Sequence, residues 1–271
     1  MIRGFSAHLN SLYGDLDEAD RCVAAVQDGF QCVEMWTPPG PEPAALLIDS
    51  LQKFNLSVAT VNTHQGPEAD DFGVVSDPSL SGWWREHFIG TVEFARAAHA
   101  EAINVLVGGR RPTATKPAQQ RCLLDNLEWA LSRLDEGDPA LLLEPLNGAD
   151  RRSPLLQNTG DVLSVMQQLG SPPGLRMLFD AYHLFQEEAD LIEALHRAAG
   201  KIGHVQLADY PGRAEPGTGE VPVDRFLKEL ARSGYAGWIG LEYSPSQGGS
   251  PFAWLLEYAE FDDRLIPGVA S

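Results

Sequence analysis

Four oxygen-bearing side chains stand near the carboxyl ends of four consecutive strand-like segments in the C-terminal half of the chain. They are Glu144 in ALLLEPLN, Asp180 in LRMLFD, Gln206 in HVQLAD and Glu242 in GWIGLEYSP. An unpaired carboxylate is costly to bury in an apolar strand. With no cation at a matching position in these strands, the acids need a shared positive partner, and a divalent ion is the simplest one. Oxygen ligands of this kind suit Mg2+ or Mn2+ better than zinc or copper.

Ion pairs within the protein are the alternative to a metal. One or two of these acids could pair with Arg176, Arg213 or a histidine instead, because structural ion pairs also perturb acidic groups. A single histidine is more often a packed residue with a satisfied hydrogen bond than a ligand. His183 carries the strongest signal, since it lies three residues after Asp180. The other polar residues near strand ends are His8, Asn10, Glu34, Asn62, His64 and His204.

A glycine- and proline-rich loop follows the third of these four segments. The stretch Gly203–Pro222 begins as a strand on which His204 and Gln206 share one face. Its loop adds Arg213 among glycines, which allow a backbone to approach a ligand closely. An ordinary solvated turn is the alternative, but function concentrates in loops held by a rigid scaffold. We expect the planar guanidinium of Arg213 to pair with a carboxylate of the ligand.

Strand-like and helix-like patterns alternate along the whole chain and would position these groups. The expected strands are Ile2–Leu9, Cys32–Trp36, Leu56–Thr63, Ile103–Val107, Ala140–Leu146, Leu175–Asp180, Ile202–Asp209 and Trp238–Tyr243. The expected helices are Asp15–Gln27, Pro43–Phe54, Trp83–Ala100, Pro117–Asp135, Gly160–Leu169, Glu187–Ala199, Val223–Ser233 and Ser250–Phe261. The alternation predicts a parallel sheet with right-handed crossovers.

Eight strand–helix units within 271 residues match the size of a (β/α)8 TIM barrel. No linker or change of composition divides the chain, so we predict a single barrel domain over residues 1–271. A doubly wound open sheet is the alternative. It predicts a glycine-rich phosphate turn after the first strand, where this chain has HLNSLYGD. In a barrel, the ends of the strands converge on one mouth, which would bring the four oxygen-bearing side chains together.

The charge and composition exclude several classes of protein. The net charge is −18 at pH 7, which opposes binding to nucleic acid or to an anionic membrane. The three cysteines form no CxxC motif, so neither a disulfide framework nor a zinc ribbon is indicated. No signal peptide and no apolar run long enough to span a bilayer is evident. We expect a cytoplasmic protein that binds no nucleic acid and no membrane; a homo-oligomer is compatible with the sequence.

The last four strand-like blocks closely resemble the hydroxypyruvate isomerase family, which belongs to the xylose-isomerase-like superfamily of sugar isomerases and epimerases. The matching blocks are LLLEPLN, FDAYHLFQEEADL, GHVQLADYPGRAEPGTGEV and GWIGLEYSPS, and FSAHLNSLYGDL and GFQCVEMW match more loosely. The resemblance implies the (β/α)8 fold and an aldose–ketose isomerisation of a small sugar acid. It departs from the family at HQGPEADDFGVVSDP, where the usual Trp and Arg are missing, and this leaves the substrate open.

The resemblance also implies roles for individual residues. Glu144 and Glu242 would be the acid/base pair, and His183 and Arg213 would contact substrate oxygens. We expect further substrate contacts from three of the polar residues at strand ends. These are Glu34, Asn62 and His204. In metal-dependent members, the divalent ion would be held by Glu144, Asp180, Gln206 and Glu242.

The expected reaction moves a proton between neighbouring carbons of an α-hydroxy carbonyl compound such as hydroxypyruvate. One glutamate would remove the proton next to the carbonyl, and the other, or the same one, would return it through an enediolate. A ketose 3-epimerase with the same glutamate pair is the first alternative. A sugar-acid-binding barrel without catalysis is the second, and a nuclease is the least favoured because such sites use several metal-binding histidines.

Overall fold

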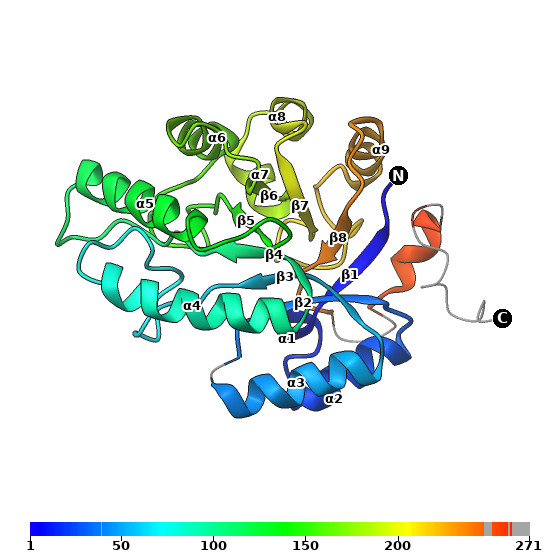
Figure 1. Ribbon diagram of the computed structural model, residues 1–271. Helices are drawn as coiled ribbons and strands as arrows, with labels where there is room; N and C mark the ends of the chain where they lie inside the picture. Colours follow the sequence, from blue (N-terminus) through cyan, green and yellow to red (C-terminus); the bar gives the residue numbers. More distant parts are fainter. Residues whose placement is uncertain (39, 247–250, 260, 262–271) are drawn as a thin grey trace.

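Eight parallel strands form a closed barrel in the computed structural model, which describes residues 1–38, 40–246, 251–259 and 261 (Figure 1). Each strand pairs with the next, and β8 pairs with β1. The strands are β1 Gly4–His8, β2 Cys32–Trp36, β3 Ser57–Asn62, β4 Ala100–Val105, β5 Ala140–Leu143, β6 Leu175–Asp180, β7 Ile202–Leu207 and β8 Trp238–Leu241. The predicted (β/α)8 architecture is confirmed.

Helices connect the strands and surround the barrel (Figure 1). They are α1 Leu9–Leu12, α2 Glu18–Gln27, α3 Pro41–Lys53, α4 Ser81–Ala97, α5 Lys116–Leu131, α6 Thr159–Gln168, α7 Ala181–Glu187, α8 Leu191–Ala198 and α9 Val223–Arg232. Among the described residues, no helix combines the length and apolar character needed to cross a bilayer.

Three details of the helices differ from the sequence prediction. The short helices α1 and α7 follow β1 and β6 directly, and neither was predicted. The side chain of Asp180 caps α7 by accepting hydrogen bonds from the backbone N–H groups of Tyr182 and His183, so the helix starts at the strand end. The last predicted helix, Ser250–Phe261, lies partly outside the described residues, and the described part contains a 3-10 helix at Ala253–Tyr258 instead.

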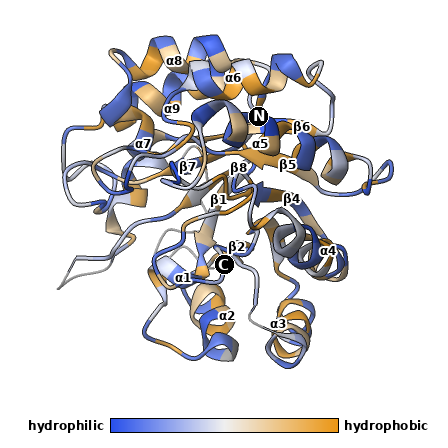
Figure 2. Cartoon of the chain, turned by 90° about the vertical axis from the view of Figure 1, so that its left-hand side faces the viewer, coloured by the Kyte–Doolittle hydropathy of each residue, from blue (hydrophilic) through white to orange (hydrophobic). Residues whose placement is uncertain are grey.

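The phase of the strands decides which residues point into the barrel. In β5, Leu141 and Leu143 belong to the large apolar core shared with the helices. Leu142, between them, packs in a separate small cluster with Ala102 of β4 and Leu178 of β6. Successive strand residues face opposite sides, so this cluster lies inside the barrel. In Figure 2 the central strands carry mostly hydrophobic residues, whereas the helices around them carry both hydrophobic and hydrophilic ones.

The inward phase continues from this cluster toward the mouth of the barrel. Two residues after each member comes a polar side chain: Asn104, Glu144 and Asp180. Each therefore shares the inner face of its strand with the apolar residue before it. On the inner face of these three strands, an apolar layer is therefore followed by a layer of polar side chains nearer the mouth of the barrel.

The long segment between β3 and α4 is fastened to the rim of the barrel. Arg111, which follows β4, forms ion pairs with Asp71 and with Asp77, the latter at 3.1 Å. The hydroxyl of Ser76 donates a hydrogen bond to the carbonyl of Val107 at 2.9 Å. The sequence prediction noted the absence of an arginine within this segment, and the structure supplies one from the neighbouring loop.

Candidate active site

Three carboxylates and one guanidinium meet at the mouth of the barrel. Asp180 ends β6, Glu144 follows β5 and Glu242 follows β8. Arg213 Nη2 lies 3.3 Å from Asp180 Oδ2 and 3.2 Å from Glu242 Oε1. The ring of Tyr182 lies beneath the same guanidinium, 5.5 Å from its central carbon. The structure therefore brings together Arg213 and the acids that the sequence selected.

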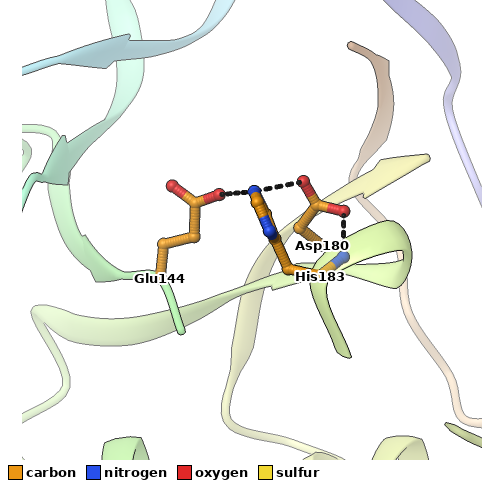
Figure 3. Close-up of side chains that lie close together, drawn as sticks. All are labelled: Glu144, Asp180 and His183. Atoms are coloured by element: carbon orange, nitrogen blue, oxygen red, sulfur yellow. Dashed lines mark hydrogen bonds and ion pairs between the residues drawn. The ribbon is translucent and has the colours of Figure 1, made fainter. Parts of the chain in front are cut away.

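His183 stands between two of these carboxylates, as Figure 3 shows. Its Nε2 lies 3.9 Å from Glu144 Oε1 and 3.8 Å from Asp180 Oδ2. Its Nδ1 faces two donors of Asn147, the backbone N–H at 3.3 Å and the side-chain amide nitrogen at 2.7 Å. A nitrogen that faces two donors must accept, so the neutral ring carries its proton on Nε2. The donor side of His183 is directed toward the site.

Burial and mutual repulsion change the protonation of these groups. Burial, together with the charges of Glu242 and Asp180, raises the pKa of Glu144 to about 8. Burial lowers the pKa of His183 to about 4, although Asp180 acts in the opposite direction. Burial also acts to lower the pKa of Arg213, but the carboxylates of Glu242, Asp180 and Glu144 outweigh it and the pKa is raised. Without a further cation, the site holds more negative charge than one arginine can balance.

Several residues around the carboxylates were not selected from the sequence. Asn104 donates a hydrogen bond from Nδ2 to Glu144 Oε2 at 2.8 Å, and Asn147 holds His183. Asn104 stands two residues after Ala102, on the same inner face, and this phase was the signal that could have identified it. His8, noted only as a strand-end residue, places Nε2 3.9 Å from Glu242 Oε1.

Glu34, His204 and Gln206 form a second group, connected to one another within the barrel. Glu34 Oε2 lies 2.5 Å from His204 Nε2, and Glu34 Oε1 accepts a hydrogen bond from Gln206 Nε2 at 2.9 Å. All three side chains are buried. Gln206 is next to Asp180 in the register of β6 and β7, so this group lies beside the carboxylates. The expected substrate contacts of Glu34 and His204 stay predictions.

Asn62 lies on β3, next to the strand that carries Asn104. It ends β3 opposite Asn104 in the register of β3 and β4, and its backbone carbonyl accepts a hydrogen bond from the backbone N–H of Thr37 at 3.2 Å. In the described part of the chain, its side chain makes no hydrogen bond to the other site residues. Its substrate contact stays a prediction.

The residues at the mouth fit a divalent cation. Ligand atoms of Glu144, Asp180 and His183 lie within 4.8 Å of one another; because Nε2 of His183 carries a proton, the two carboxylates and not the ring would contact an ion. Burial, then repulsion from Glu242 and Asp180, raises the pKa of Glu144, and a cation would offset this repulsion. Gln206 Oε1 is buried and accepts no hydrogen bond within the described residues, although a buried carbonyl oxygen normally has a partner. A hard cation would satisfy both the acids and this oxygen.

Asp209 holds the loop that carries Arg213. Its carboxylate accepts four backbone hydrogen bonds, from Tyr210 at 2.8 Å, Gly217 at 2.8 Å, Gly219 at 2.9 Å and Val221 at 2.9 Å. A side chain at Gly219 would place its Cβ 2.1 Å from the carbonyl oxygen of Tyr210. The loop is therefore folded tightly around one buried carboxylate.

Replacing Asp209 with alanine will unfold this loop locally. Four buried backbone donors lose their acceptor, and we expect the free energy of unfolding to fall by a few kcal/mol. Hydrogen exchange of residues 210–221 should become faster, whereas exchange in β5 and β6 stays slow. The control is Asp224→Ala, which removes an exposed carboxylate. Unchanged exchange in the loop of the Asp209→Ala variant would contradict this role.

Comparison with known proteins agrees with the fold. The xylose isomerase-like TIM barrel family model matches residues 22–260. A putative hydroxypyruvate isomerase of Streptomyces coelicolor is 34% identical over 93% of this chain and 95% of its own length. The hydroxypyruvate isomerase of Escherichia coli is 33% identical over 90% and 94%, and a 2-oxo-tetronate isomerase of Pectobacterium atrosepticum is 30% identical over 89% and 92%.

The fold has close counterparts among solved structures. A protein of Brucella melitensis described as an AP endonuclease, family 2, superimposes with a TM-score of 0.88 at 24% identity, over 95% of this chain and 99% of that one. At this identity the likeness concerns the fold alone.

The chain belongs to the xylose isomerase-like TIM barrel family. It is an isomerase of this family, as are the relatives that match it over most of their length, and the family acts on small molecules.

Proposed function

We propose that the protein isomerises a short 2-oxo acid that carries a hydroxyl on the carbon next to the carbonyl, such as hydroxypyruvate. The observation that carries this proposal is the arrangement of Arg213 among Glu144, Asp180 and Glu242 at the mouth of the barrel. The names of the relatives support it: hydroxypyruvate and 2-oxo-tetronate both combine a carboxylate, a ketone and a neighbouring hydroxyl-bearing carbon.

The carboxylate of such a substrate suits Arg213. The Nε of this arginine is buried and has no hydrogen-bond partner in the described part of the chain, so part of its planar fork is free to donate. A guanidinium that offers parallel N–H groups binds a carboxylate more specifically than a lysine does. His183, which carries its proton on Nε2, is arranged to donate to a carbonyl or hydroxyl oxygen of the substrate.

The glutamates supply the proton transfer. One carboxylate removes the proton from the hydroxyl-bearing carbon, and the other, or the same one, returns a proton to the former carbonyl carbon. The proton of the substrate hydroxyl passes to the former carbonyl oxygen. In the metal-free site Glu144 suits this task because its pKa of about 8 lies near neutral pH, where a general acid/base is most effective. Asn104 fixes Glu144 Oε2, which leaves Oε1 directed toward the site.

A divalent ion, Mg2+ or Mn2+, would be held by Glu144, Asp180, Gln206 and Glu242. When bound, it would supply positive charge that stabilises the enediolate. The cytoplasmic location, the absence of nucleic acid binding and a homo-oligomeric state stay predictions from the sequence.

Product analysis by NMR tests the proposal. The protein, with and without Mn2+ and with EDTA, is incubated with hydroxypyruvate, 2-oxo-tetronate, fructose and tagatose. We expect hydroxypyruvate to be converted to tartronate semialdehyde, or 2-oxo-tetronate to its 3-oxo isomer. Conversion of the ketoses alone, with inversion at C3, would replace the proposal with the 3-epimerase alternative. Binding of the acids without conversion would favour the sugar-acid-binding barrel.

Replacing Arg213 with methionine tests the recognition of the carboxylate. We expect KM for the preferred acid to rise roughly 10²-fold, the scale for losing one partner of a buried charge pair. Steady-state kinetics gives KM and kcat separately, and turnover of the neutral analogue dihydroxyacetone is the control. An equal rise in KM for the acid and for the neutral analogue would show that Arg213 does not recognise the carboxylate.

A further inference from the structure

The side chain of Glu34 crosses from β2 to β7, past the two strands β1 and β8 that lie between them in the closed barrel. It reaches His204 Nε2 at 2.5 Å and Gln206 Nε2 at 2.9 Å, and the hydroxyl of Ser6 lies 3.5 Å from Glu34 Oε2. Its exposed fraction is 0%. Such a buried carboxylate is retained at a cost in free energy, and the reaction proposed above does not use it directly.

The intervening strands make room for this side chain. Gly240 of β8 lies in register with Ser6 of β1 on one side and with Gln206 of β7 on the other. A Cβ on Gly240 would lie 2.4 Å from both oxygens of Glu34, well inside a normal contact. The space that a side chain at position 240 would fill is therefore occupied by the carboxylate of Glu34. The absence of a side chain at Gly240 is a condition for the contact between Glu34 and Gln206.

The carboxylate of Glu34 fixes the orientation of the Gln206 amide. An ionised carboxylate accepts hydrogen bonds and cannot donate them, so only the NH2 group of the amide can face Glu34. The other oxygen of Glu34 is occupied by His204, whose Nε2 must carry a proton to donate to it. The carbonyl oxygen of Gln206 then points elsewhere, where it is buried and without a partner among the described residues.

The reversed amide would be unsuitable beside the carboxylates. The two ends of an amide have nearly the same shape, so packing alone does not distinguish them. With the NH2 group turned outward, Gln206 could not act as a ligand, because an amide nitrogen that bears two protons offers no lone pair to a cation. Asp180, the neighbour of Gln206 in the register of β6 and β7, is among the acids that would share the ion.

We propose that Glu34 is a positioning residue that turns the carbonyl oxygen of Gln206 toward a divalent cation at the mouth of the barrel, with Gly240 providing the passage for its side chain. The inference rests on the proposed metal site, and it assigns Glu34 and His204 a role through Gln206 in place of the substrate contact expected from the sequence.

Metal affinity tests this role without the need for turnover. Binding of Mn2+ to the metal-free protein is measured by EPR and by calorimetry in the wild type and in two single variants, Glu34→Gln and Gly240→Ala. Outer partners of metal ligands typically contribute about 10- to 100-fold to affinity, and we expect a loss of this size in both variants. Ser6→Ala, which removes only the 3.5 Å contact, is the control and should bind Mn2+ as the wild type does.

Exchanging the two side chains distinguishes positioning from a purely structural effect. In Glu34→Gln with Gln206→Glu, the hydrogen bond is kept with donor and acceptor reversed, and a carboxylate oxygen faces the ion. We expect this double variant to recover Mn2+ affinity to within about 3-fold of wild type, whereas Gln206→Glu alone, with two adjacent carboxylates, does not. Circular dichroism and thermal unfolding confirm that each variant is folded.

Three results would overturn the proposal. The first is unchanged Mn2+ affinity in folded Glu34→Gln and Gly240→Ala. The second is a loss of Mn2+ affinity on Glu34→Gln that is as large in a Gln206→Leu background, where Glu34 has no amide to orient, as it is in the wild type. The third is a wild type that does not bind Mn2+. Isomerisation by that metal-free wild type would leave the proposed function standing, so the two failures can be told apart.

Discussion

Replacing either Glu144 or Glu242 with glutamine will lower kcat/KM by about 10²–10⁴-fold, the usual contribution of a positioned general acid or base. Glutamine has nearly the same shape as glutamate, but it cannot take up a proton. The variants should therefore bind the substrate and remain folded while the transfer between the two carbons fails. Steady-state kinetics on the preferred substrate, with the Mn2+ concentration held at saturation for each variant, measures this loss.

The matched control is Glu86→Gln, which makes the same change on the exposed side of α4 and should leave kcat/KM unaltered. Saturating metal separates a loss of chemistry from a loss of metal affinity, since both glutamates are also expected ligands. Wild-type turnover in either Glu144→Gln or Glu242→Gln would contradict the assignment of the pair.

The metal-free Glu144→Gln variant will be more stable than the metal-free wild type at alkaline pH. The pKa of Glu144 is raised from 4.5 in the unfolded chain to about 8 in the folded protein, first by burial and then by Glu242 and Asp180. Between these two values the unfolded state ionises more readily than the folded state, so the wild type loses stability as the pH rises. The glutamine in the variant stays neutral at every pH, so the variant does not lose this stability.

Denaturant unfolding in EDTA at several pH values measures this difference. The two proteins should be close in stability near pH 5, and the gap should widen up to about pH 8 and then stay constant, reaching on the order of a few kcal/mol. Glu86→Gln should follow the wild type at every pH. A gap of constant size from pH 5 to pH 9 would show that the carboxylate of Glu144 is not held in the neutral form. Added Mn2+ should make the wild type more stable than Glu144→Gln, because the ion binds the folded wild type more tightly than it binds the folded variant.

The architecture of the barrel could be predicted because it depends on local patterns that the chain repeats. Leu142 and Glu144, or Leu178 and Asp180, stand two residues apart, so each acid shares one face of its strand with the leucine. Convergence at the mouth then follows from the parallel arrangement of the strands. For these reasons the acids and Arg213 could be proposed as one group before any contact was known.

The remaining parts of the site depend on contacts between strands distant in the sequence. The pairing of Glu34 with Gln206 depends on the register of four strands and on the empty position at Gly240, which no local pattern reveals. Asn104 stood on the predicted inner face and its phase could have identified it, but its hydrogen bond to Glu144 joins two strands and was not evident from the sequence. The helix α7 was not predicted because it is only seven residues long and because its capping residue, Asp180, had already been assigned to the site.

Deuterium incorporation tests the central claim, transfer of a proton through an enediolate at this site, most directly. The protein is incubated with hydroxypyruvate in D2O and followed by NMR, beside Glu144→Gln and Glu242→Gln. The account predicts that deuterium enters the CH2OH carbon of hydroxypyruvate as tartronate semialdehyde appears, and that both variants lose this exchange. Undiminished exchange and conversion in both variants would contradict it.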